Sequence, residues 1–145
     1  MNEKHFRLGV IGPIELSLAA SKIAVSKAAD RDTREFAGFE LSEAIGVTSV
    51  LKELRTAVPA MDAKARAAIT TLKNTPQGEL FDKAYIQAQL DNHIVMRDLA
   101  QNYLKNSAGK TSMAEIHTRH IATLMLSSCT EHIALTTRIL DGLTA

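Results

Sequence analysis

Apolar and polar residues recur along this chain at the three-to-four-residue spacing of amphipathic helices, and a few short polar stretches interrupt them. The interruptions carry aspartate, asparagine, proline and glycine, which are typical of helix caps and helix ends. No stretch alternates as a half-buried strand does, and no repeat recurs at a fixed period. The pattern predicts helices at about residues 4–29, 32–57, 61–72, 79–104 and 111–141.

Four of these helices are long and one is short, which predicts an all-α fold, a four-helix bundle in a single domain over residues 1–145. The short extra helix lies between the second and third long helices. The segment 57–77 that contains it reaches roughly 40 Å, the length of a bundle. The chain can therefore cross over from end to end, as in ferritin-like bundles. An up-down-up-down bundle with a capping helix is equally open at this stage.

Several residues predict how the helices begin or bend. Asp32 or Thr33 suits the N-cap of the second long helix, and Ser112 with Glu115 matches a capping box at the start of the last. Pro13 predicts either a kink in the first helix or its first turn.

Composition and charge exclude several classes of protein. The chain has 17 basic and 16 acidic residues and is 46% hydrophobic, so it is neither a disordered tail nor a basic nucleic-acid binder. No window reaches roughly 18 uncharged apolar residues, so we expect no membrane span. No signal peptide is visible, which predicts a soluble protein, cytoplasmic as the sequence stands or periplasmic if a leader was removed. The single cysteine, Cys129, offers no disulfide and no zinc cluster.

Five acidic or imidazole residues interrupt the apolar stripes of the helices. They are Glu15 on the first helix, Glu40 and Glu43 on the second, His93 on the third long helix and His132 on the last. A carboxylate that faces the core must be paired, protonated or bound to a cation. In helical bundles, glutamates and histidines from facing helices commonly bind metal ions.

Heights along the bundle, counted from the turns, place Glu15, Glu43 and His93 at one level. The same count places His132 roughly two turns nearer the end of the bundle, close to the level of Glu40. One shared cluster and two separate polar layers are both compatible with this count. The carboxylates can equally be paired at the edge of the core, for example with Lys22, and the histidines can be hydrogen-bonded core residues.

The chain lacks complete catalytic motifs. It has no Glu-x-x-His pair of the di-iron bundles, no phosphate-binding loop, no G-x-S-x-G and no H-E-x-x-H. Cys129 has no convincing nucleophile environment and is expected to be an inert buried thiol. We therefore expect a protein that is not an enzyme.

Three segments resemble the bacterial ferritin-like family known as domain of unknown function 4142. They read IELSLAASKIAVSKAADRDTREFA, ELFDKAYIQAQLDNH and EHIALTTRIL, and Phe81-Asp82-x-x-Tyr85 followed by His93 is the most specific part. The resemblance implies a ferritin-like four-helix bundle, often exported to the periplasm, without a settled activity.

The resemblance also implies a set of metal ligands. Glu15, His93 and His132 fall on matching positions, and the family's Asp-His pair in the second helix falls on Glu43 and Ala44, so one imidazole is missing. A metal-site role therefore carries over to Glu15, Glu43, His93 and His132.

Two functions follow from these observations. The first is a non-catalytic binding protein associated with stress or the cell envelope, with no certain cofactor. The alternative is a bundle that binds a transition metal ion (iron, manganese or zinc) at a degenerate carboxylate/histidine site. The long helical surface can support a homodimer, and the sequence identifies no small-molecule ligand.

Overall fold

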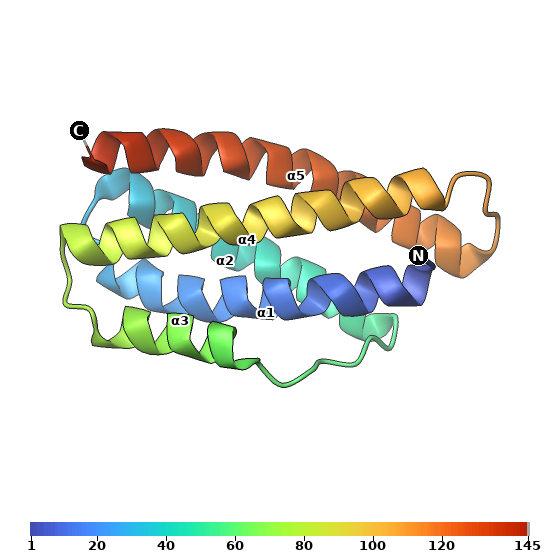
Figure 1. Cartoon of the computed structure of the whole chain (residues 1–145), viewed down its shortest axis with the longest axis horizontal. Coiled ribbons are helices and arrows are strands. Elements are labelled where there is room, and N and C mark those ends of the chain that lie inside the picture. Colours follow the sequence, from blue (N-terminus) through green and yellow to red (C-terminus); the bar gives the residue numbers. More distant parts are fainter. Residues whose placement is uncertain (145) are drawn as a thin grey trace.

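The computed structural model describes residues 1–144 and folds them into α-helices joined by short loops (Figure 1). No strand occurs within these residues, so the predicted all-α class is confirmed. The helices agree with the predicted segments to within four residues at each end. They are α1 (Glu3–Lys27), α2 (Arg31–Glu53), α3 (Ala63–Asn74), α4 (Glu79–Asn106) and α5 (Met113–Thr144).

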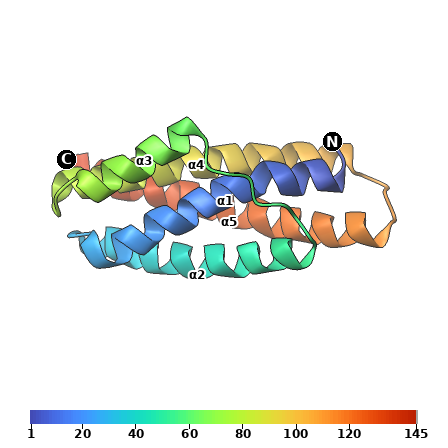
Figure 2. The same ribbon diagram turned by 90° about the horizontal axis from the view of Figure 1, so that it is seen from below.

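The four long helices lie side by side, and the short helix α3 packs outside them against α1 and α4 (Figures 1 and 2). Helices α1 and α5 run in one direction, and α2 and α4 run in the other (Figure 1). The segment 54–78, which contains α3, returns the chain along the outside before α4 begins. The structure thus has the crossover connection, one of the two arrangements that the sequence left open.

The end of α2 shows why this helix is shorter than predicted. It ends at Glu53 rather than near residue 57, because Arg55 adopts a positive φ of 60° and the Thr56 amide donates back to the Leu51 carbonyl at 3.0 Å. The Arg7 guanidinium from α1 donates to the Leu54 carbonyl and to Thr56 Oγ1, both at 2.8 Å. These contacts satisfy the polar groups that a longer helix would have paired internally.

Side chains cap the starts of α1, α2, α3 and α5, although not always the predicted ones, whereas α4 begins after Gly78 without a side-chain cap. The N-cap of α2 is Asp30, whose carboxylate accepts from the Thr33 amide at 2.8 Å, so the assignment to Asp32 or Thr33 is wrong by two or three residues. At α5, Ser112 Oγ accepts from the Glu115 amide at 3.3 Å, which is half of the predicted capping box. The Glu115 carboxylate turns instead towards the Tyr103 hydroxyl.

By length and composition alone, α1 passes the test for a helix that could cross a membrane, with a mean hydropathy of 1.5 over its most apolar window. Pro13 lies inside this helix, and its carbonyl accepts from the Asn92 side chain at 2.7 Å. A continuous stripe of α1 is buried against the other helices. The core helix of a bundle passes the same composition test, and the burial of this stripe accounts for the apolar character of α1.

The hydrophobic core is divided into two parts along the length of the molecule. One part gathers around Phe6, Leu51 and Tyr103 near the start of α1, and the other around Phe36 and Phe81 near its end. Between the two parts lies a layer of buried polar side chains: Ser17, Glu40, Gln89, His93 and His132. Because uncompensated polar burial is costly, this layer requires a specific explanation.

Asp82 shows how one motif fixes the end of the molecule near the α1–α2 turn. It is 1% exposed in the first turn of α4, and its two carboxylate oxygens accept from the amides of Ala29 at 3.0 Å and Asp30 at 2.8 Å. This carboxylate therefore ties the loop between α1 and α2 to α4 and fixes where α2 begins.

We expect Asp82→Asn to lower the free energy of unfolding by about 1–3 kcal/mol, because an amide can accept only one of the two backbone hydrogen bonds. Urea unfolding followed by circular dichroism measures the change. Glu79→Gln is the matched control in the same helical turn, since it removes only an exposed ion pair with Lys83 and should change stability by less than about 0.5 kcal/mol. Equal effects of the two substitutions would contradict the role given to Asp82.

Candidate metal centre

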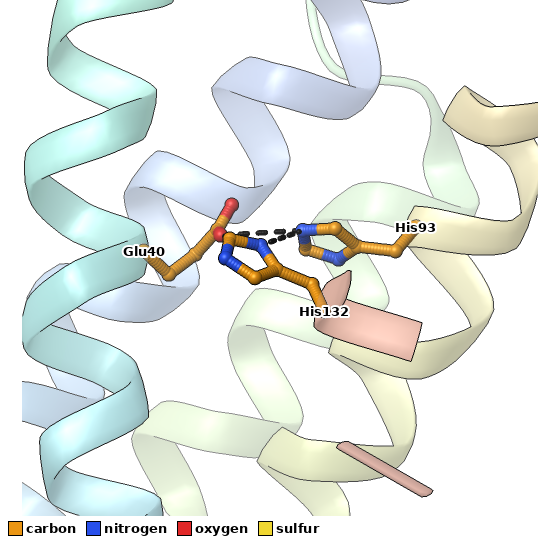
Figure 3. A group of neighbouring side chains, drawn as sticks. All are labelled: Glu40, His93 and His132. Atoms are coloured by element: carbon orange, nitrogen blue, oxygen red, sulfur yellow. Dashed lines mark hydrogen bonds and ion pairs between the residues drawn. The ribbon is translucent and has the colours of Figure 1, made fainter. Parts of the chain in front are cut away.

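The middle of the polar layer is built from one side chain on each of three helices. Glu40 lies on the inward stripe of α2 between Phe36 and Ala44, His93 lies on that of α4, and His132 lies on that of α5. Their exposed fractions are 4%, 2% and 5%. Helical periodicity thus directs all three side chains into the same buried space (Figure 3).

The three side chains meet through one atom each. Glu40 Oε2 lies 3.2 Å from His93 Nε2 and 3.0 Å from His132 Nδ1, and the two imidazole nitrogens lie 3.2 Å apart. The atoms therefore form a nearly equilateral triangle of one oxygen and two nitrogens (Figure 3). Each is an atom type that binds divalent transition metals.

The far nitrogen of His93 determines which tautomer the ring adopts. His93 Nδ1 lies 2.7 Å from the Gln89 carbonyl, and because a carbonyl can only accept, Nδ1 carries a proton. In the neutral ring, Nε2 then presents a lone pair towards Glu40 Oε2 and His132 Nδ1. A lone pair of the Glu40 carboxylate faces this nitrogen lone pair. The cluster therefore needs either an extra proton or a cation between these atoms.

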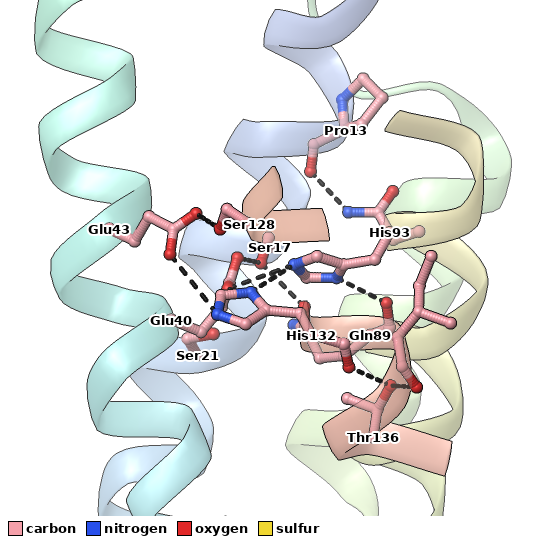
Figure 4. A network of polar contacts seen from close by, with 12 residues as sticks. Pro13, Ser17, Ser21, Glu40, Glu43, Gln89, His93, Ser128, His132 and Thr136 are labelled. Atoms are coloured by element: carbon pink, nitrogen blue, oxygen red, sulfur yellow. Dashed lines mark hydrogen bonds and ion pairs between the residues drawn. The ribbon is translucent and has the colours of Figure 1, made fainter. Parts of the chain in front are cut away.

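The far nitrogen of His132 also has an acidic neighbour. His132 Nε2 lies 3.5 Å from Glu43 Oε2, and the other oxygen of Glu43 accepts a short hydrogen bond from Ser128 Oγ (Figure 4). The Glu43 side chain is 39% exposed, so it lies at the boundary between the cluster and solvent. It orients the His132 ring so that Nδ1 faces Glu40.

The second oxygen of Glu40 is held by α1. Ser17 Oγ donates to Glu40 Oε1 at 2.7 Å and lies 2.8 Å from the side-chain amide of Gln89 (Figure 4). One helical turn away, Ser21 Oγ and the Tyr85 hydroxyl form a 2.7 Å hydrogen bond. All four long helices therefore contribute to the layer, three through the triangle and α1 through its serines.

The surroundings of the triangle differ on its two sides. On one side the Phe36 ring packs edge-on against both imidazoles, with centroids 5.2 Å from His132 and 6.2 Å from His93. On the other side a cavity of about 20 Å³ is bordered by Glu40 and His93 themselves. Its remaining walls are Ile14, Glu43, Ala44, Val47, Met96, Met125 and Cys129.

The acid and the imidazoles perturb each other's protonation. Burial by itself raises the pKa of Glu40, but hydrogen bonds from His132 and His93 outweigh it and bring this pKa down from 4.5 to about 2. Burial lowers the pKa of His132, yet the facing Glu40 carboxylate raises it above its usual value. Without a metal ion, the Glu40 carboxylate is therefore held in its charged form by the imidazoles that face it.

The structure brings together two of the four residues predicted as metal ligands. His93 and His132 are in direct contact, and Glu43 lies beside them at 3.5 Å from the far nitrogen of His132. Glu15 lies elsewhere, where its Oε1 forms a 3.5 Å ion pair with Lys52 rather than the proposed pair with Lys22. The expected meeting of Glu15, Glu43 and His93 is therefore wrong for Glu15.

The misplacement of Glu15 has a simple geometric cause. Around Glu15, the buried stripe of α1 runs through Ile14, Ser17 and Ser21, one position before the face that carries Glu15. Leu8, which lies two turns before Glu15 on that same face, is 50% exposed. Beyond Ile14, serines and alanines occupy the inward positions, and hydropathy alone does not identify them as core residues.

Glu40 is the ligand candidate that the predicted site lacks, although the sequence marked it as an acid on an apolar stripe. The estimate of heights along the bundle separated His93 from His132 because it placed the turn between α4 and α5 at Gly109 and counted equal numbers of residues away from it on each helix. The direct contact between His93 and His132 shows that the two helices pair about residues 112–113 instead. When the centre of the pairing moves by one residue, the α4 residue that faces a given α5 residue changes by two. The observed pairing therefore brings His132 level with His93 and with Glu40.

Comparison with known proteins identifies the family. The family model described as domain of unknown function (DUF4142) matches residues 15–126, which is more than half of the chain. The chain belongs to this family. The region matched to the family contains Glu40 and His93, whereas His132 lies beyond it. No curated protein and no solved structure matches the chain significantly.

The depressed pKa of Glu40 predicts how the stability of the metal-free protein depends on pH. A carboxyl group with a pKa of about 2 when folded and 4.5 when unfolded stabilises the fold above pH 4.5, and this contribution is lost as the pH falls towards 2. We expect Glu40→Gln to destabilise the metal-free protein by about 1–3 kcal/mol at pH 5.5.

The difference between wild type and Glu40→Gln should shrink as the pH is lowered from 5.5 to 3.5. Over this range the unfolded wild-type carboxyl group, with a pKa of 4.5, takes up a proton while the folded one stays charged, so the wild type loses stability and Glu40→Gln does not lose this contribution. Urea unfolding in the presence of a chelator measures it at each pH. A difference that stays constant with pH would contradict the charged state of Glu40.

Cys129 provides a second test of the environment of the cluster. Burial, followed by the nearby charges of Glu40 and Glu43, raises the pKa of this thiol to about 12. We expect a disulfide reagent at pH 8 to modify Cys129 only as fast as the native protein unfolds. The reaction in denaturant gives the control rate, and rapid modification of the native protein would contradict the burial of this thiol.

Proposed function

We propose that this protein binds a transition metal ion through Glu40, His93 and His132, in a four-helix bundle of the ferritin-like type. The observation that carries the proposal is the buried triangle of one carboxylate oxygen and two imidazole nitrogens from three helices. The bundle assignment is supported by the crossover segment between α2 and α4, which run in the same direction.

The dimensions of the triangle support coordination. Ligands at 2.0–2.1 Å from a tetrahedral zinc ion lie about 3.3 Å apart, and adjacent ligands of a six-coordinate ion at similar bond lengths lie about 3.0 Å apart. The measured separations of 3.0–3.2 Å fall in this range. Little movement of the three side chains is therefore needed to receive an ion.

The partners of the two histidines support the same assignment. In metal sites, the ring nitrogen that does not bind the ion usually donates to a backbone carbonyl or a carboxylate. His93 Nδ1 donates to the Gln89 carbonyl, and His132 Nε2 faces Glu43. With a cation in the triangle, the lone pairs of Glu40, His93 and His132 all point at positive charge.

The donor set favours an ion that accepts mixed nitrogen and oxygen ligands, namely iron, manganese or zinc. Three protein ligands are typical of reactive sites rather than closed structural ones. The chain also lacks the Glu-x-x-His motifs of di-iron bundles, so we propose one ion rather than two.

The test is metal analysis of protein purified without chelator and freed of any histidine tag, then stripped and reloaded with zinc, manganese or anaerobic iron(II). We expect about one ion per chain and, at an ion concentration near 100 times Kd, stabilisation of about 2.7 kcal/mol. Glu40→Gln, His93→Gln and His132→Gln should each abolish the stoichiometric binding. Glu43→Gln should weaken it by about 10- to 100-fold, as loss of an outer-shell partner does.

The exposed pair His117 and His120 provides the matched control, since both side chains lie on the surface of α5. Replacing both with glutamine should leave the stoichiometry and the thermal shift unchanged. Binding that survives Glu40→Gln but disappears in this control would place the ion on the surface. In that case, or if no ion binds, the polar layer serves structure alone and the chain is a non-catalytic binding protein.

A further inference from the structure

We infer that the ion held by Glu40, His93 and His132 keeps an open coordination position that faces the 20 Å³ cavity, where it takes a neutral ligand of one or two heavy atoms. Water and diatomic gases belong to this class. The inference rests on the proposed metal site and adds to it a second ligand, its direction and its size.

The direction of the open position follows from the two sides of the triangle. The Phe36 ring closes one side by packing edge-on against both imidazoles. The cavity lies on the other side, and two of the ligand residues, Glu40 and His93, form part of its wall. The open coordination position of an ion bound to the three atoms therefore faces the cavity.

The size of the cavity limits what can bind. A water molecule needs roughly 10–15 Å³ of such space, so about 20 Å³ accommodates one water or a diatomic molecule but not an organic substrate. The nearest apolar walls include Ala44, Met96 and Met125, which are buried. Larger ligands would require these packed side chains to move.

The charge of the cavity favours neutral ligands over anions. Glu43 joins Glu40 and His93 in its wall, so two carboxylates and one imidazole border a space whose other walls are apolar. A divalent ion balances the charges of Glu40 and Glu43, so a bound anion would leave a net negative charge in this buried space, whereas a neutral ligand would not. Glu43 and Val47 are the partly exposed members of the wall, so the cavity lies nearest to solvent along α2.

Nitric oxide is the appropriate probe, because it is neutral and diatomic and forms iron(II) adducts with distinctive electron paramagnetic resonance and absorption spectra. We expect the iron(II)-loaded, anaerobic wild type to form a stoichiometric adduct. Ala44→Val, which adds two methyl groups to the cavity wall, should weaken adduct formation at least tenfold while iron stoichiometry is unchanged. Azide, an anion of three atoms, should bind far more weakly than nitric oxide.

Ala44→Gly is the matched control, since it changes the same position without filling the cavity and should retain the adduct. Val47→Ile is a second cavity-filling variant in case Ala44→Val does not fold. Iron bound without any nitric oxide adduct, or an adduct unaffected by both filling variants, would overturn the open position and leave the metal site intact. Failure of the wild type to bind iron, manganese or zinc would overturn both proposals.

Discussion

The burial of the Glu40 carboxylate is the constraint on which the centre of this molecule depends. A charged oxygen pair that is 4% exposed between two apolar half-cores must be compensated on every side. Ser17 satisfies one oxygen, and His93 and His132 face the other. The geometry that neutralises the carboxylate is the same geometry that would bind a cation, so stability and chemistry converge on one group of atoms.

The crossover connection places these partners. Helices α1 and α2 form one antiparallel pair, and α4 and α5 form another. Glu40 belongs to the first pair, while His93 and His132 belong to the second. Because the segment 54–78 carries the chain back along the outside, α2 and α4 run in the same direction (Figure 1). Glu40, His93 and His132 meet at a common height. The polar layer links the two pairs.

The sequence predicted the helices well because their caps and breaks are local signals. It also marked the acids and histidines that stand out against apolar neighbours, and His93 and His132 do face each other. It misplaced Glu15, because serine and alanine occupy the inward positions of α1 beyond Ile14 and do not stand out as core residues. The choice of Glu40 over Glu43 depended on helix pairing, which is set by loop geometry and packing rather than by any local pattern.

The division of Glu40, His93 and His132 between the two helix pairs has a consequence for biosynthesis. Glu40 leaves the ribosome long before His132, and neither helix pair alone contains all three donors. A nascent chain that ends before α5 therefore lacks a complete set of donors, however well its first helices have formed. Loading with an ion would be a post-translational event, and a trapped ion would hold the two pairs together and slow their separation.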